Sequence, residues 1–329
     1  MKLDSCRELK AQLAGRIFER MAMSAEEVSG YGMPARNVKR VEAIRPTIAL
    51  GVSQRRKGYR VAVRIQRRGM ERSRHLQVIL KEAKGEVDVR YVGRVVKRAS
   101  WFQSRHRPLR IGTSIGHAAV SAGTLGCFVR TKDGEPCILS NNHVLADENK
   151  GKRGDPILQP AVFDGGKRPG DIAGRLAKYV RLRRNETNTV DCATCTVGRS
   201  VEFNPSRLRG VGPLAGVVPP GGDVDLVVKL GRTSGRTRGR VTAFEMDNLV
   251  VAYDMGILRF DDQVEIEDAE NGSFSEGGDS GSLIFTASDR LGFALLFAGS
   301  EQGGSNGKGL TYANPLTAVL DSLKVELLT

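Results

Sequence analysis

Gly277-Gly278-Asp279-Ser280-Gly281-Ser282, followed by the apolar run 283–285, is the stretch on which the prediction of this fold depends. A serine hydroxyl is a weak nucleophile, so it needs a base to take its proton and donors to hold the oxyanion formed on attack. Glycine reaches backbone conformations that other residues avoid, which lets successive N–H groups point to one place. The stretch therefore predicts a nucleophile loop whose oxyanion hole is made by the N–H groups of Gly278 and Ser280. The alternative is a glycine-serine loop of an ordinary β-protein, and the other residues of the chain decide between the two.

His143 is the histidine whose context best suits a general base. It follows directly after a predicted strand, in the order Ser140-Asn141-Asn142-His143-Val144. A base at the end of a strand can be held rigidly beside a nucleophile. The other histidines have less suitable contexts, on a predicted helix, in a basic segment and after a glycine-rich turn: His75, His106 and His117.

Asp191 is the predicted partner of that base. A carboxylate beside an imidazole fixes its tautomer and stabilises its charged form. Asp191 lies 48 residues after His143 and 89 before Ser280. Asp223 and Asp225 are competing acids, but they stand just before the predicted first strand of a second barrel.

A second serine motif, Gly112-Thr113-Ser114-Ile115-Gly116, matches the nucleophile elbow of α/β-hydrolases. That fold requires the order serine, acid, histidine, and a helix after the serine. Only two acidic residues separate Ser114 from His143, and the sequence after Ser114 does not predict a helix. We therefore do not expect Ser114 to be a nucleophile.

The three residues His143, Asp191 and Ser280 agree in type, order and spacing, and residues 110–329 thereby resemble a trypsin-like, chymotrypsin-fold serine protease. The resemblance implies that His143 is the base, that Asp191 orients it and that Ser280 attacks the substrate. The stretch from Lys229 to Gly235, with Gly239-Arg240-Val241 after it, resembles the hairpin that opens the second barrel in an intracellular bacterial subgroup. That subgroup is similar to the plant narrow-leaf type proteases, and its members also carry a small domain in front.

The sequence departs from the trypsin pattern at the substrate pocket. Phe274 stands six residues before the nucleophile, where trypsins carry the acid that binds lysine or arginine. The stretch 296–300 resembles the strand that lines the primary pocket, so Phe274, Phe297, Ala298 and Gly299 predict a modest or partly filled apolar pocket. In secreted members the residue matching Asp279 pairs with an amine freed by cleavage, which we do not expect here because a whole domain precedes the barrels.

Ten short segments separated by glycine-rich turns predict a mainly β protein with two antiparallel barrels of the six-stranded type. They are 124–130, 136–141, 172–179, 189–197, 226–229, 239–245, 248–253, 263–266, 282–286 and 292–298, with a helix at 315–324. We place the protease domain at 108–329, with barrel one ending near 205 and barrel two starting near 222. A β-β-α-β pattern at 46–100 predicts a small basic α+β domain, and 1–45 predicts an amphipathic helix and a connector.

Composition narrows the remaining possibilities. The chain has 329 residues, no predicted signal peptide or membrane-spanning run, and five cysteines, so we expect a cytoplasmic protein. Cys192 and Cys195 form a C-x-x-C, but there is no second pair to complete a zinc site. We predict neither a metal nor a cofactor.

Positive charge is concentrated in the N-terminal third. Residues 1–110 hold 27 Lys and Arg against 10 Asp and Glu, whereas residues 111–329 hold 24 against 27. The densest cluster is Arg55-Arg56-Lys57, with Arg60, Arg64, Arg67 and Arg68 nearby. This surface predicts either binding of nucleic acid or an acidic partner, or an interface between subunits of a homo-oligomer. We favour the interface, because Tyr59 is the one aromatic residue in the cluster that could stack on a base.

Three functions remain open on this sequence. The first is a serine endopeptidase acting on protein or peptide. The second is a protease-like scaffold or binding module with weak catalysis, in which the basic domain recruits its partner. The third is an esterase with the same three residues.

Overall fold

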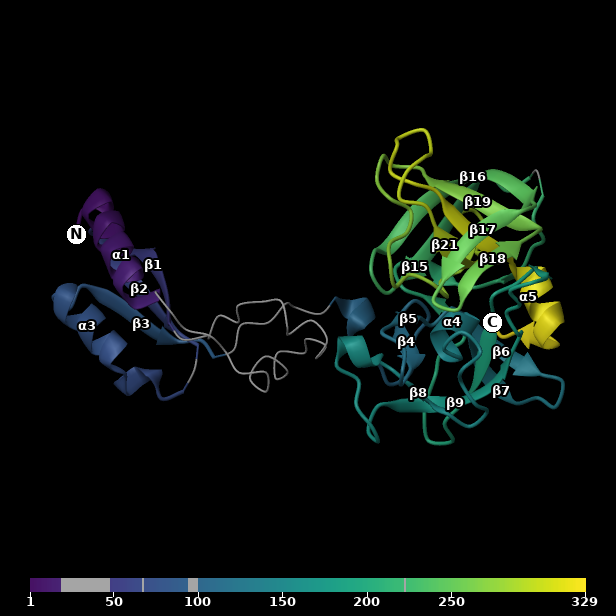
Figure 1. The fold of residues 1–329 in the computed structure, drawn as a ribbon, viewed down its shortest axis with the longest axis horizontal. Coiled ribbons are helices and arrows are strands. Elements are labelled where there is room, and N and C mark those ends of the chain that lie inside the picture. Colours follow the sequence, from purple (N-terminus) through teal and green to yellow (C-terminus); the bar gives the residue numbers. More distant parts are fainter. Residues whose placement is uncertain (19–47, 67, 94–99, 222) are drawn as a thin grey trace. The chain divides into compact units, whose positions relative to one another are not determined.

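The computed structural model describes residues 1–18, 48–66, 68–93, 100–221 and 223–329 (Figure 1). The chain forms two compact units, Met1–Arg98 and Ala99–Thr329. The predicted connector at 28–46 and the first residues of the basic linker, 97–99, lie outside the described residues. No helix in the described part of the chain is long and apolar enough to cross a membrane.

The first unit contains the predicted β-β-α-β pattern. Strand β1 (Ile48–Gln54) pairs antiparallel with β2 (Tyr59–Ile65), and β2 pairs in parallel with β3 (Val87–Tyr91). Helix α3 (Arg74–Glu82) makes the crossover between the parallel strands, and the one-turn helix η2 (Met70–Arg72) precedes it. The Ser73 hydroxyl caps α3 by accepting a hydrogen bond from the Leu76 N–H, at 3.2 Å.

Helix α1 (Leu3–Phe18) belongs to the core of this first unit. Cys6 and Leu13 on its apolar stripe are fully buried, in one cluster with Val61 and Ile79. The stripe therefore packs on the helix's own domain. The structure thus joins the predicted N-terminal helix to the accessory domain, and 1–98 is one unit.

The second unit begins with the short helix η3 (Trp101–Gln103) and contains two large sheets. The first sheet, mostly teal in Figure 1, has the order β23-β6-β7-β11-β9-β8-β4-β5. Its strands are β4 (Ser114–His117), β5 (Gly123–Thr124), β6 (Cys127–Thr131), β7 (Pro136–Ser140), β8 (Pro156–Leu158), β9 (Ile172–Tyr179), β11 (Ala193–Val197) and β23 (Val325–Leu327). In the part of the chain that the structure describes, no strand pair closes this sheet, so it is a curled half-barrel.

The second sheet, green to yellow in Figure 1, closes on itself. Its order is β14-β21-β20-β15-β16-β19-β22, and the additional pairing of β21 with β22 completes a six-stranded barrel. Its strands are β14 (Gly216–Val217), β15 (Leu226–Gly231), β16 (Gly235–Met246), β19 (Gln263–Asp268), β20 (Leu283–Thr286), β21 (Leu291–Gly299) and β22 (Thr311–Pro315). The predicted mainly β fold with two barrels is confirmed.

Several shorter elements lie between the two sheets or connect them. Strand β10 (Thr187–Asn188), from the first-barrel segment, pairs in parallel with β18 (Gly256–Phe260), which forms a hairpin with β17 (Leu249–Tyr253). Helix α5 (Leu316–Leu323) packs against β21 and β22, and the chain then returns to the first sheet as β23.

One continuous apolar core contains Leu139 of β7, Leu230 of β15 and Leu295 of β21, so the barrels are packed directly against each other. A two-residue ladder, β12 (Arg207–Leu208) with β13 (Gly212–Pro213), lies in the connection between them.

Candidate active site

The Ser280 loop is held against the first sheet by Thr124. The Thr124 N–H donates to the Ser280 carbonyl at 2.8 Å, and the Thr124 hydroxyl donates to the Gly278 carbonyl at 3.0 Å. Gly278 has φ +95°, and a Cβ there would lie 2.7 Å from the Thr233 hydroxyl oxygen. The loop conformation therefore requires glycine at this position, as the glycine-rich sequence predicts.

The N–H groups of Gly278 and Ser280 are left without protein acceptors in the described structure. The N–H groups of the intervening and following residues, by contrast, donate to backbone carbonyls: Asp279 to Glu276, Gly281 to Leu296 and Ser282 to Asp279. The N–H groups of Gly278 and Ser280 are thus available as donors to a ligand, and their assignment as an oxyanion hole stays a prediction.

His143 and Asp191 are in direct contact. His143 lies in the short helix α4 (Asn142–Leu145) that follows β7, and its Nδ1 is 2.5 Å from Asp191 Oδ2. The Asp191 side chain is fully buried, and its Oδ1 accepts the N–H groups of Asn142 at 2.6 Å and His143 at 3.3 Å. This contact leaves Nε2 as the ring nitrogen that can exchange a proton with another group.

Tyr253 also binds Asp191, a contact that the sequence does not predict. Its hydroxyl donates to Asp191 Oδ2 at 2.8 Å, and its ring lies edge-on to the His143 ring with centroids 5.9 Å apart. Tyr253 ends strand β17 of the second-barrel segment. Its position at the end of a strand is the only sequence signal that it carries.

The charge of Asp191 changes the proton affinity of both neighbours. Burial by itself lowers the pKa of His143, but the charge of Asp191 and its hydrogen bond outweigh burial, and the pKa lies above its usual 6.5. Burial raises the pKa of the Tyr253 phenol well above 10, and the Asp191 charge adds to this effect. Tyr253 is therefore a neutral donor to the carboxylate at physiological pH.

The Ser280 loop and the His143 helix meet at Gly123. A Cβ on Gly123 would lie 2.4 Å from Val144 Cγ2 and 3.1 Å from the Ser280 carbonyl oxygen. Val144, which follows His143 in the chain, and the backbone of Ser280 therefore both pack against Gly123. Within the described residues the Ser280 hydroxyl makes no hydrogen bond, and such contacts between a nucleophile and its base often tighten only when substrate binds.

The alternative acids Asp223 and Asp225 and the alternative serine Ser114 lie away from His143. Asp225 is exposed and pairs with Arg240 at 3.2 Å, and Asp223 is exposed too. Ser114 is fully buried on β4, where its hydroxyl accepts the Ala161 N–H at 3.0 Å. None of the three is in contact with His143 in the described structure.

Two other histidines and the C-x-x-C pair are engaged in contacts or buried elsewhere in the fold. His117 contacts Asp155 at 3.1 Å, and His106 contacts the Trp101 carbonyl at 2.7 Å. Cys192 and Cys195 are both buried free thiols, whose pKa burial raises. Buried thiols of this kind are unreactive.

The residues predicted to line the substrate pocket differ in exposure. Phe274 is buried in the core of the second barrel, and Phe297 is buried against Phe260, with ring centroids 4.8 Å apart. Ala298 is half-buried and Gly299 exposed. The predicted pocket assignment stays a prediction, with Ala298 and Gly299 as the members that a ligand can reach.

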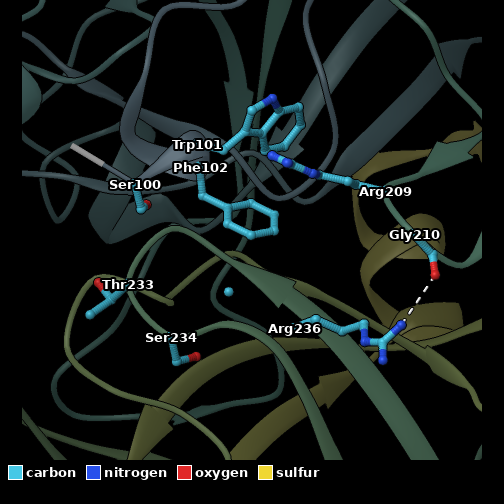
Figure 2. A pocket seen from close by; sticks show the side chains of 9 residues that line it. Ser100, Trp101, Phe102, Arg209, Gly210, Thr233, Ser234 and Arg236 are labelled. Atoms are coloured by element: carbon cyan, nitrogen blue, oxygen red, sulfur yellow. Dashed lines mark hydrogen bonds between the residues drawn. The ribbon is translucent and has the colours of Figure 1, made fainter. Parts of the chain in front are cut away.

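A surface pocket of about 480 Å³ is lined by residues of the segments 100–102, 209–210 and 233–236 (Figure 2). Trp101, Phe102 and Arg209 form one part of it, and the Arg209 guanidinium carbon is 3.9 Å from the Trp101 ring centroid. Thr233 and Ser234 form the opposite part (Figure 2). His143, Asp191 and Ser280 do not line this pocket.

Comparison with known proteins gives structural matches only. No family model matches the chain, and no curated protein does. Solved structures that are similar include Thermobifida fusca Protease A, with 16% identity, 67% of this chain and 97% of that chain covered and a TM-score of 0.46. Cellulomonas bogoriensis chymotrypsin has 19% identity, coverage of 67% and 97% and a TM-score of 0.45. Nocardiopsis protease has 18% identity, coverage of 67% and 98% and a TM-score of 0.45.

The fold can be stated from the sheets themselves. One curled sheet and one closed six-stranded barrel share a core, and the His143–Asp191 pair and the Ser280 loop come from opposite sides of that junction. Residues 99–329 have the two-barrel fold of the trypsin-like serine proteases.

Proposed function

We propose that the protein is a serine endopeptidase that hydrolyses peptide bonds through an acyl-enzyme. The observation that carries the proposal is the short contact between His143 and the buried Asp191, beside a serine loop with two unoccupied N–H groups. A base, its orienting acid, a nucleophile and oxyanion donors are the set that acyl transfer requires. Here all of them lie at one junction.

Each residue has a defined role in the proposed reaction. Ser280 Oγ attacks the substrate carbonyl carbon while His143 Nε2 takes its proton. Asp191 keeps the other ring proton on Nδ1 and stabilises the imidazolium. The N–H groups of Gly278 and Ser280 bind the oxyanion, and His143 then protonates the leaving amine. Water, deprotonated by the same nitrogen, hydrolyses the resulting ester.

An esterase with the same residues is the nearest alternative, because the acyl-transfer steps are shared. A catalytically weak scaffold is less favoured, because a scaffold has no need for a buried acid on the histidine and free oxyanion donors. The two enzymes are separated by comparing turnover of an apolar peptide amide with that of the matching ester. An endopeptidase cleaves both, and cleavage of the ester alone would favour the esterase.

The Ser280→Ala variant tests the nucleophile. Removing the group that forms the covalent intermediate lowers turnover by on the order of 10⁶ in serine proteases. We expect this loss of peptide hydrolysis with an unchanged circular dichroism spectrum. Ser114→Ala is the matched control, since it removes a buried hydroxyl outside the site, and Ser282→Ala should also be mild. Full activity of Ser280→Ala, or loss in Ser114→Ala, would contradict the assignment.

A further inference from the structure

The pocket of Figure 2 contains two guanidinium groups that no carboxylate neutralises. Arg209 and Arg236 both line it, and none of the described residues that line it is acidic. In the part of the chain that the structure describes, neither arginine forms an ion pair. Two positive charges therefore remain uncompensated at this pocket.

Each guanidinium is held in place and keeps N–H donors free. Arg209 stacks on the Trp101 ring, its guanidinium carbon 3.9 Å from the ring centroid, and stacking occupies the face of the group rather than its N–H edge. Arg236 Nη1 donates to the carbonyl of Gly210, the residue after Arg209, at 3.1 Å (Figure 2). Donors that are already fixed lose less side-chain entropy when they bind a ligand.

Aromatic carbon lies beside these donors. The Trp101 and Phe102 rings meet edge to face with centroids 5.0 Å apart, and both side chains are half-buried. A Cβ on Gly235 would lie 3.2 Å from Phe102 Cε2. Because Gly235 has no side chain, the Phe102 ring stays uncovered on this side, and a flat apolar group can pack against it.

His106 is subject to the same excess of positive charge. It contacts the Trp101 carbonyl at 2.7 Å. Burial lowers the pKa of His106 below its usual 6.5, although the hydrogen bond to that carbonyl opposes the shift. The charges of three arginines lower this pKa further, namely Arg110, Arg209 and Arg107. The charge of Arg209 thus acts on its surroundings, and a bound anion would offset it.

The opposite wall of the pocket adds no free donors. The Thr233 hydroxyl donates to the Gly277 carbonyl at 2.8 Å, and the Ser234 hydroxyl donates to Asp279 Oδ2 at 2.6 Å. A hydroxyl has one proton to donate, so both of these are already in use. The attraction of this pocket for an anion therefore depends on its two arginines.

We propose that the pocket binds a phosphate monoester carried on an aromatic ring, with Arg209 and Arg236 on the phosphate and Phe102 against the ring. A phosphate monoester carries a charge of about −1.5 to −2 at pH 7, which matches two guanidinium groups. The planar guanidinium fork also fits phosphate oxygens better than an ammonium does. The site is separate from His143, Asp191 and Ser280, and it does not depend on the proposed hydrolysis.

Trp101 is the one tryptophan of the chain, so tryptophan fluorescence reports directly on this pocket. The probe is phenyl phosphate, titrated at constant ionic strength, with isothermal titration calorimetry as the second measurement. We expect saturable binding with a Kd on the order of 1 mM, as suits a ligand of this size. Inorganic phosphate lacks the ring and benzyl alcohol lacks the charge, so each should bind about tenfold more weakly or less.

Arg209→Gln and Arg236→Gln each remove one charge. Both side chains are exposed, so we expect both variants to fold like the wild type. Each should weaken phenyl phosphate binding by about tenfold, because a hydrogen bond to a charged group is lost. Arg240→Gln is the matched control, since Arg240 lies on the same strand β16 as Arg236 but outside the pocket, and it should leave the Kd unchanged.

Three results would overturn the proposal. The first is a folded wild-type protein that gives neither heat nor a fluorescence change at phenyl phosphate concentrations far above the expected Kd. The second is wild-type affinity in both Arg209→Gln and Arg236→Gln. The third is an equal loss in Arg240→Gln, which would show attraction by the general positive charge. Inorganic phosphate that binds as tightly as phenyl phosphate would overturn the role given to Phe102. Hydrolysis enters none of these measurements, so failure of the proposed function would leave their result unchanged.

Discussion

Asp191 receives hydrogen bonds from both barrel segments. His143 and the backbone of α4 bind it from the first, and the Tyr253 hydroxyl binds it from the second. Its own N–H donates to the Asn314 side chain at 2.9 Å, on strand β22. The carboxylate is therefore fixed from both barrel segments, and a carboxylate fixed in this way holds the imidazole in one tautomer and orientation.

Asp191→Asn tests this residue. The amide keeps the shape of the carboxylate but holds the imidazole in the wrong tautomer, which lowers turnover by about 10⁴ in serine proteases. We expect that loss in steady-state peptide hydrolysis, with the fold retained. Asp225→Asn is the control, since Asp225 is an exposed acid paired with Arg240. Greater loss in Asp225→Asn would transfer the orienting role to that residue.

Residue types and their spacing in the sequence were enough to predict several of the side chains that meet at the candidate site. His143 and Asp191, which the sequence pairs, are in contact in the structure, and the N–H groups of Gly278 and Ser280 have no protein acceptor in the described residues. Their role in binding an oxyanion stays a prediction. The sequence did not reveal that Tyr253 binds Asp191, nor that the buried Lys229 Nζ lies 3.1 Å from Asp279 Oδ2. Both pairings join distant parts of the chain, and each depends on how a strand is placed within a barrel rather than on any local pattern.

At the scale of elements, the β17–β18 hairpin connects the two barrel segments beside the proposed site. β18 pairs with β10, and Glu148, which follows α4, accepts the N–H groups of Asp254 and Met255 at the hairpin tip at 2.9 and 2.7 Å. Strand β17 was predicted as the segment 248–253, one of the short segments between turns, but β18 was not predicted. In the structure β18 does alternate, with Leu258 and Phe260 buried, but the apolar Ile257, which stands between Gly256 and Leu258, is exposed, and this obscures the alternation in the sequence.

Tyr253→Phe tests the contribution of this hairpin. A hydrogen bond to a charged group is worth about 1.5 kcal/mol or more, which corresponds to about tenfold in rate. We expect kcat/KM to fall about tenfold. Without the phenol, the Asp191 charge acts more strongly on the imidazolium, so the pKa of His143 should rise further.

The pH profile gives the decisive measurement for this variant. His143 must be neutral to act as base, so kcat/KM rises with pH through its pKa, which lies above 6.5 in the wild type. In Tyr253→Phe this acid limb should move to higher pH. Tyr179→Phe, which removes a hydroxyl 3.4 Å from the Asn149 carbonyl, is the control. An acid limb that stays in place would exclude a role for Tyr253 through Asp191.

At the scale of the whole molecule, the two units carry different charge. The Arg55-Arg56-Lys57 turn between β1 and β2 is exposed, as the sequence predicts for a binding surface. Arg64, however, is bound to Asp88 at 2.8 Å, which removes one member of the predicted cluster. Arg67 lies outside the described residues. The choice between a subunit interface and a polyanion site stays a prediction, as does a cytoplasmic location.

The mass of the full-length protein in solution tests the interface. We expect a homo-oligomer at micromolar concentration, and dissociation when Arg55, Arg56 and Lys57 are all changed to serine. Charge removal is preferable to deleting residues 1–45, because α1 buries Cys6 and Leu13 in the core of the first unit. A monomeric wild type would exclude the interface. Salt-sensitive binding of nucleic acid that the triple variant loses would then favour the polyanion site.

The central claim is that Ser280 is a nucleophile activated by His143. The most direct measurement is reaction of the folded protein with a fluorophosphonate, followed by mass spectrometric location of the adduct. The account predicts one adduct, on Ser280, formed far more slowly in His143→Ala and absent in Ser280→Ala. An adduct on another serine, or no reaction by a folded wild-type protein, would contradict it.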